Sequence, residues 1–178
     1  MSNDTPVQRA PPGHFYYLGF GSNLLTERIH LMNPTAEYVA TVRLRDYALG
    51  FAHFSRSWQG AGATIYRSMG DDVYGVLWRL SDEDSDHLDK QEHVYHRITV
   101  TVECINSGVK YECRSYQSND VATGNHLPSP HYKHVLVCGA IEHCLPEHYI
   151  DMLKAVSDNG HRGRIKYKFS VLEHLNNA

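Results

Sequence analysis

The order of strand-like and helix-like segments constrains the fold of this 178-residue chain more than any other feature. Stretches rich in aromatic and β-branched residues, which favour strands, fill most of the first two thirds of the sequence. Helical patterns are clearest near the end, and strands and helices do not alternate regularly. The sequence therefore predicts an α+β fold with a mostly antiparallel, barrel-like sheet and flanking helices.

The predicted strands are separated by short turn signals. The Met-Gly-Asp sequence at 69–71 predicts the turn of a hairpin, and Asn-Ser-Gly at 106–108 predicts a second turn. The segment 42–54 is predicted to form one bent strand or two short ones. The predicted strands are residues 14–20, 42–54, 61–68, 72–80, 97–105 and 110–118.

Helices are predicted around the strands and at the end of the chain. Ser22 or Asn23 is expected to cap the first helix, and Ser81 begins a helix whose first turn is rich in Asp and Glu. Residues 131–144 are ambiguous by periodicity, although a helix is favoured. A helix is also expected to start at Pro146 and to stop before Asn159-Gly160.

Composition indicates one globular domain, residues 14–178, after a flexible arm at 1–13. Hydrophobic residues make up 42% and charged residues 21%, and the net charge of −3 without long basic runs argues against nucleic acid as a partner. No apolar stretch approaches a membrane span, and the polar start resembles no signal peptide. The four cysteines form no C-x-x-C pair, so reduced thiols in a cytoplasmic protein are expected.

The stretch YLGFGSNLLTERIH, residues 17–30, places a strand, small residues and a helix in immediate succession. Such a junction gathers unpaired backbone N–H groups and can bind an anion. Leu24 replaces the third glycine of a dinucleotide motif, and neither a P-loop nor a G-x-S-x-G elbow is present. The junction is therefore interpreted as a site for a carboxylate or an oxyanion, the alternative being an ordinary helix N-cap with permissive glycines.

Glu92 is a second candidate because it lies at the C-terminal end of the helix that Ser81 begins. A carboxylate there opposes the helix dipole, and a functional residue is one reason for such a violation. The alternative is an exposed glutamate beside Lys90 or His93. The histidines lack metal-ligand spacing, so no metal is expected.

Several segments together resemble the γ-glutamylcyclotransferase family. They are FGSNLLTERIHLMNP, GVLW, LDKQE followed by VYHR, CRSY, PSPHYKHVLVCGA and LPEHY, and the resemblance runs from about residue 15 to about residue 156. The GSNLLTERIH and Ser-Pro-x-Tyr blocks are specific when they occur together. The best match is to the cytosolic enzymes that act on γ-glutamyl amino acids.

The resemblance implies a barrel-like α+β fold, no cofactor, a small γ-glutamyl substrate and a homodimer. It assigns the catalytic role to Glu92 and contacts with substrate to Tyr95 and Tyr132. One departure is Phe20, where the family usually has tyrosine, and it is expected to affect substrate preference. The implied substrate loop comprises Tyr17, Leu18, Gly19, Phe20, Gly21 and Ser22.

The implied reaction converts γ-glutamyl amino acids to 5-oxoproline and a free amino acid. The substrate's own α-amine attacks its γ-carbonyl, which explains why the sequence offers no serine or cysteine nucleophile motif. Glu92 is expected to act as general acid and base. Two alternatives remain: a glutathione-specific cyclotransferase, and a protein that binds an anionic metabolite without turnover.

Overall fold

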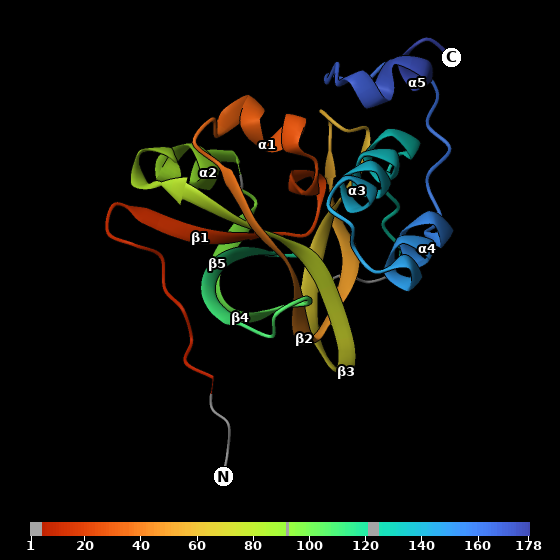
Figure 1. Cartoon of the computed structure of the whole chain (residues 1–178). Helices are drawn as coiled ribbons and strands as arrows, with labels where there is room; N and C mark the ends of the chain where they lie inside the picture. Colours follow the sequence, from red (N-terminus) through yellow and green to blue (C-terminus); the bar gives the residue numbers. More distant parts are fainter. Residues whose placement is uncertain (1–4, 92, 121–124) are drawn as a thin grey trace.

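A computed structural model describes residues 5–91, 93–120 and 125–178. In these ranges five strands close into a barrel in the order β1-β3-β2-β4-β5 (Figure 1). All neighbouring strands are antiparallel except β1 and β5, which run parallel. The strands are β1 (His14–Gly19), β2 (Glu37–Ser55), β3 (Gly60–Ser81), β4 (Tyr95–Cys104) and β5 (Lys110–Ser118). The predicted α+β class with a mostly antiparallel, barrel-like sheet is confirmed.

Short helices flank the barrel. In Figure 1, α1 and α2 lie side by side at one end, and α3 and α4 pack together along the side. The α-helices are α1 (Thr26–Met32), α2 (Ser85–Gln91), α3 (Pro130–Glu142), α4 (Glu147–Ala155) and α5 (Glu173–Asn176). The 3₁₀ turns are η1 (Ser22–Leu24), η2 (Asp82–Asp84) and η3 (Ser170–Leu172). The helix favoured after residue 130 and the one expected after Pro146 are both confirmed.

The predicted hairpin around residues 69–71 is wrong. Both halves belong to β3 and pair with β2, with Arg45 opposite Asp72 and Tyr47 opposite Arg67. Residues 68–71 bulge out between these pairs, and the Gly70 N–H donates to Asp46 Oδ1 over 3.0 Å. The turn signal was real, since Gly70 has a φ of 84°. It marks a bulge, and the segment 42–54 forms part of one long strand.

The described part of the predicted N-terminal arm, residues 5–13, contacts the barrel. Gln8 forms a parallel bridge with Tyr111, and its N–H donates to the Lys110 carbonyl over 2.8 Å. Arg9 forms an ion pair with Glu112 at 3.1 Å. The chain is therefore attached to β5 before β1 begins.

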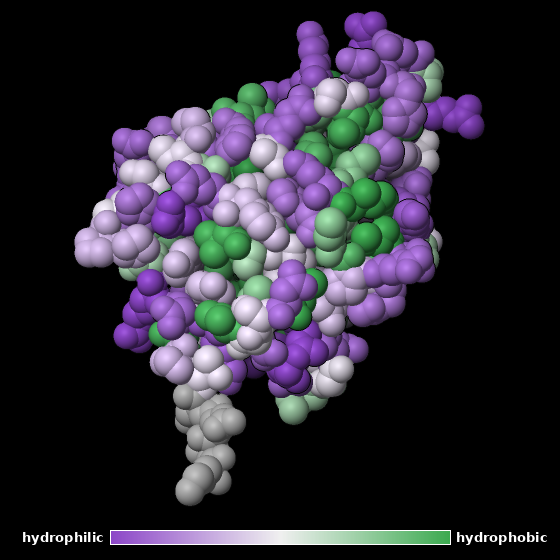
Figure 2. Space-filling view, in the orientation of Figure 1, coloured by the Kyte–Doolittle hydropathy of each residue, from purple (hydrophilic) through white to green (hydrophobic). Residues whose placement is uncertain are grey.

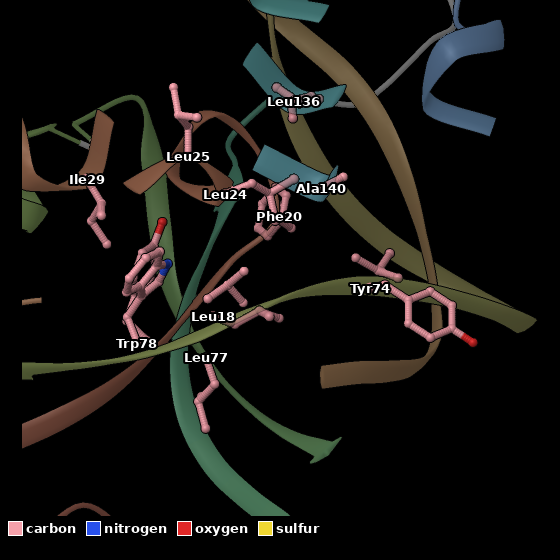
Figure 3. Close-up of a cluster of buried hydrophobic side chains, with 14 of the residues drawn as sticks. Leu18, Phe20, Leu24, Leu25, Ile29, Tyr74, Leu77, Trp78, Leu136 and Ala140 are labelled. Atoms are coloured by element: carbon pink, nitrogen blue, oxygen red, sulfur yellow. The ribbon is translucent and has the colours of Figure 1, made fainter. Parts of the chain in front are cut away.

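The hydrophobic core connects the barrel to α3 (Figure 3). In that view Leu24 lies beside Ala140, where the chain leaves β1 and meets α3. A Cβ atom on Gly139 would lie 2.6 Å from the Leu24 backbone carbon and 2.7 Å from the Leu25 nitrogen. Only glycine permits this close approach of two backbones, so Gly139 fixes the position of the strand–helix junction.

The surface in Figure 2 is mostly polar, and apolar side chains gather over the side where α3 and α4 lie. Ile141 of α3 and Met152 of α4 are among the exposed large apolar residues. Within the parts of the chain that the structure describes, no helix is long and apolar enough to span a membrane.

Candidate functional site

A cavity of about 900 Å³ lies beside the strand–helix junction. Its walls come from the junction, α1, the end of α2, strand β3 and a segment close to the C-terminus. The volume falls in the range of small-molecule sites. Six of the residues predicted for the site line this cavity: Tyr17, Phe20, Gly21, Ser22, Tyr95 and Tyr132.

Two tyrosine hydroxyls meet at one residue of β3. The Ala63 N–H donates to the Tyr132 hydroxyl over 2.9 Å, and the Tyr95 hydroxyl donates to the Ala63 carbonyl over 3.0 Å. Tyr132 comes from α3 and Tyr95 from the first residue of β4, so the barrel brings together two residues distant in sequence. The positions of both hydroxyls are thus set by the protein backbone.

Gly21 lies directly against one of these hydroxyls. A Cβ atom at this position would be 2.8 Å from the Tyr132 hydroxyl oxygen and 3.2 Å from the Ala63 Cβ. Tyr132 is 5% exposed and hydrogen-bonded, so it has little freedom to move away. The second glycine of Gly-Phe-Gly-Ser-Asn therefore provides space beside Tyr132.

Three backbone N–H donors of the junction belong to residues that line the cavity. Within the described ranges, the N–H groups of Gly21, Ser22 and Asn23 have no hydrogen-bond partner. The carbonyls of Gly21 and Ser22 accept hydrogen bonds from Leu24 and Leu25, which closes the η1 turn. Three adjacent donors at a cavity wall can stabilise a negatively charged oxygen.

The prediction that Ser22 or Asn23 caps the first helix is wrong, because Leu25 precedes α1 and no side chain caps it. Asn23 is instead buried, and its side chain donates to the Tyr17 hydroxyl over 3.0 Å. Its carbonyl accepts from Trp78 Nε1 over 2.9 Å, and its Oδ1 accepts from Gln91 Nε2 over 3.2 Å. Asn23 thus links the junction to the barrel and to α2.

Helix α2 is held at both ends. Gln91, its last residue, donates to Asn23 and accepts from Asn33 Nδ2 over 3.1 Å. Near the start, the Thr35 N–H and hydroxyl both donate to Asp84. Burial alone would raise the pKa of the Asp84 carboxyl, but the hydrogen bonds, chiefly from Thr35, outweigh it and leave that pKa below its ordinary value.

The predicted catalytic residue, Glu92, lies outside the described residues. The residues on either side of it, Gln91 and His93, both line the cavity. Because Gln91 is held by two asparagines, the polypeptide leaves α2 from a fixed point at the cavity wall.

Tyr116 also lines the cavity and donates to Asp89 of α2. Burial, and then this hydrogen bond, raises the pKa of the Tyr116 hydroxyl well above its ordinary value. The hydroxyl therefore stays protonated near neutral pH and serves as a hydrogen-bond donor.

Two residues of the predicted substrate loop lie behind the cavity wall. Leu18 is completely buried in the barrel core. Gly19 packs against Trp78, where a Cβ atom would be 3.2 Å from Nε1 and 2.9 Å from the Asn23 carbonyl oxygen. Neither residue lines the cavity, so both support the residues that do.

Sequence reasoning missed the opposite end of the cavity. Arg28, Trp58 and Tyr167 line it, together with Lys166 and Lys168. Arg28 belongs to an ordinary helical pattern, and the tail that carries Tyr167 has no clear periodicity. No group of three or more possible metal ligands occurs among the residues that the structure describes.

Comparisons with known proteins show which sequences and folds this chain is similar to. The AIG2-like family model matches residues 72–153. The γ-glutamylcyclotransferase of Mus musculus is 42% identical over 158 residues, which cover 85% of this chain and 83% of the mouse protein. The protein of the same name from Homo sapiens is 39% identical over the same shares of each chain.

A solved structure titled gamma-glutamyl cyclotransferase superposes with a TM-score of 0.83. It is 36% identical, and the match covers 93% of this chain and 99% of the other. Sequence identity and fold thus agree over most of the length of both proteins. This chain belongs to the γ-glutamylcyclotransferase family.

Proposed function

We propose that this protein converts γ-glutamyl amino acids to 5-oxoproline and a free amino acid. The observation that carries the proposal is the set of three N–H groups, at Gly21, Ser22 and Asn23, that have no hydrogen-bond partner among the described residues and belong to residues lining the cavity. Such donors suit a substrate whose carbonyl oxygen becomes negatively charged during reaction. The curated relatives from mouse and human carry the name of this activity.

The reaction is a rearrangement of bonds within the substrate. Its α-amine attacks the γ-carbonyl carbon, the bond from that carbon to the amide nitrogen breaks, and a five-membered lactam forms. The proton lost by the amine goes to the departing nitrogen, and water is not consumed. Because both reacting groups belong to one molecule, well-oriented attack reaches effective molarities on the order of 10⁵ M.

The enzyme must transfer protons and stabilise one charge. In the proposal, Glu92 accepts a proton from the substrate ammonium, which frees the attacking amine, and later donates a proton to the leaving nitrogen. Over the whole reaction the ammonium nitrogen gives up two protons, and the departing nitrogen gains two and leaves as an ammonium group. The donors of Gly21 to Asn23 bind either the oxyanion or the substrate α-carboxylate. Tyr132 and Tyr95, whose hydroxyls are held on Ala63, orient the glutamyl group.

The direct test offers γ-glutamyl-alanine and glutathione separately to the purified protein and measures 5-oxoproline by mass spectrometry. We expect 5-oxoproline and alanine in equal amounts from the first compound. Turnover of glutathione alone would instead favour a glutathione-specific enzyme. Saturable binding of γ-glutamyl-alanine without 5-oxoproline would identify a binding protein and contradict the proposal.

We further propose a cytoplasmic homodimer, as the family resemblance implies. All four cysteines are free, which fits a reducing compartment. Light scattering at assay concentration tests the assembly, and a mass equal to one chain would contradict the dimer.

A further inference from the structure

Arg28 is a buried cation with no hydrogen-bond or ion-pair partner among the residues that the structure describes. Its side chain belongs to α1 and is 4% exposed. Within the described ranges, its Nε and Nη1 atoms donate no hydrogen bond and no carboxylate forms an ion pair with it. An unpaired buried charge is unfavourable by several kcal/mol unless something compensates it, so this arrangement requires an explanation.

Two aromatic rings hold the guanidinium group in place. Its carbon atom lies 4.9 Å from the ring centroid of Tyr167 and 6.0 Å from that of Trp58. Cation–π contacts of this kind orient the guanidinium group, and the ring faces accept no conventional hydrogen bond from its N–H groups. The rings therefore orient Arg28 without satisfying its hydrogen-bonding groups.

The same aromatic wall leads to the tyrosine hydroxyls. The ring centroids of Trp58 and Tyr132 lie 5.0 Å apart in an edge-to-face arrangement, and those of Trp58 and Tyr167 lie 4.4 Å apart. All three rings and Arg28 line one cavity. Arg28 is thus separated by a single ring from Tyr132, which contacts Gly21 and Ala63.

The charge of the wall favours an anion at this end. Lys166 and Lys168, which flank Tyr167 in the sequence, also line the cavity. Glu27 is the only acidic side chain among the described lining residues, and it accepts hydrogen bonds from the Ser170 N–H and hydroxyl. A carboxylate entering here would meet a positive potential and a planar donor that matches its geometry.

We propose that Arg28 binds the carboxylate of the departing amino acid and so selects γ-glutamyl amino acids over γ-glutamyl amines. The inference rests on the proposed function. In a γ-glutamyl amino acid, only the amide nitrogen and one Cα atom separate this carboxylate from the reacting carbonyl carbon. A γ-glutamyl amine has the same glutamyl group and no such carboxylate, which makes it the matched probe.

The experiment compares γ-glutamyl-alanine with γ-glutamyl-ethylamide in the wild type and in Arg28→Met. We expect kcat/KM for γ-glutamyl-alanine to fall roughly 10- to 100-fold, since a charge-assisted hydrogen bond is lost. The value for the ethylamide should change little. Arg28→Lys keeps the charge without the planar donor pair, so it should restore part of the preference.

Arg67→Met is the matched control. Arg67 also stacks on a tyrosine, at 4.7 Å from the Tyr47 ring centroid, but it is exposed and does not line the cavity. The substrate preference should be unchanged in that variant. Thermal unfolding of Arg28→Met should match or exceed that of the wild type, because an unpaired buried charge is removed. If Arg28→Met does not fold, Arg28→Lys and Arg28→Gln supply the same substrate comparison.

Equal losses of kcat/KM for both substrates would show that Arg28 contacts the glutamyl group or supports the fold, and would overturn the inference. An unchanged ratio of kcat/KM in a folded Arg28→Met protein would overturn it as well. If the wild type makes no 5-oxoproline from either compound, the proposed function fails and the inference falls with it. Failure of the inference alone leaves wild-type turnover of γ-glutamyl-alanine intact.

Discussion

The two ends of the cavity differ in how their polar groups are satisfied. At the hydroxyl end, formed by Tyr17, Tyr95 and Tyr132, each hydroxyl is hydrogen-bonded to Asn23 or to Ala63. At the arginine end, formed by Arg28, Trp58 and Tyr167, the guanidinium meets aromatic rings and no hydrogen-bond acceptor among the described residues.

This difference separates two tasks of an enzyme site. Groups held by the protein keep their geometry before substrate arrives, as the positioning of reacting atoms requires. A hydrogen-bond donor that lacks a protein partner discriminates between ligands, because only some ligands supply the acceptor that it needs. We therefore expect changes at the hydroxyl end to affect all γ-glutamyl substrates alike, and changes at the arginine end to sort them by their leaving group.

The largest effect is expected from Glu92→Gln. Loss of a general acid and base should lower kcat by about 10²- to 10⁴-fold for γ-glutamyl-alanine and γ-glutamyl-ethylamide equally. Steady-state kinetics with both substrates measures this. Glu83→Gln is the matched control, because Glu83 is an exposed glutamate in the η2 turn before α2, and it should retain full activity. Near wild-type turnover by Glu92→Gln would remove Glu92 from the mechanism.

Gly21→Ala should give the next largest effect. The new Cβ atom would press against the Tyr132 hydroxyl, and displacement of a positioning group by about 1 Å can lower activity about 10²-fold. Both substrates should lose activity equally. The measurement is a double-mutant cycle with Tyr132→Phe, which removes the atom that the Cβ meets. If Gly21→Ala lowers activity as much in the Tyr132→Phe background as in the wild type, the contact with Tyr132 is not the cause.

The order of segments was sufficient to predict the sheet class, since the six predicted strand stretches, rich in β-branched and aromatic residues, correspond to the five observed strands. The pairing of those strands in the sheet was harder to predict. The glycine turn at residue 70 has the same local signal whether the chain reverses or bulges, and only the pairing of β3 with β2 along its whole length decides between them.

The site was predictable at one end only. The small residues of the junction carry a local pattern, and Tyr132 was assigned through the family resemblance. The hydrogen bonds of Asn23, by contrast, depend on Tyr17, Trp78 and Gln91. Arg28 has no hydrogen-bond partner in the described part of the chain, and this is a tertiary property that a helical sequence pattern does not reveal. The rings that hold it come from segments separated by more than a hundred residues.

Gln91→Ala tests whether α2 positions the segment that carries Glu92. The change removes the hydrogen bonds to Asn23 and Asn33, and we expect kcat to fall about 10-fold with little change in KM, since a positioning contact is lost. Asn33→Ala should give a similar loss, and the double variant should be no worse than either single one. Additive losses would mean that the two residues act independently.

Phe20→Tyr should give the smallest effect. It tests whether Phe20 acts with the hydroxyl end or with the arginine end of the cavity. Phe20 lines the cavity, is 6% exposed and lies beside Leu24 and Ala140 in Figure 3. A hydroxyl added here faces substrate without altering the backbone donors of the junction, so kcat should hold while the preference among γ-glutamyl substrates changes by less than about 10-fold. Competition between γ-glutamyl-alanine and a γ-glutamyl amino acid with a larger side chain measures this preference directly.

Phe15→Tyr is the matched control, because Phe15 is comparably buried and does not line the cavity. A large fall in kcat with an unchanged ranking of substrates would show that Phe20 belongs functionally to the hydroxyl end, and the boundary between positioning and selection would then lie closer to Arg28.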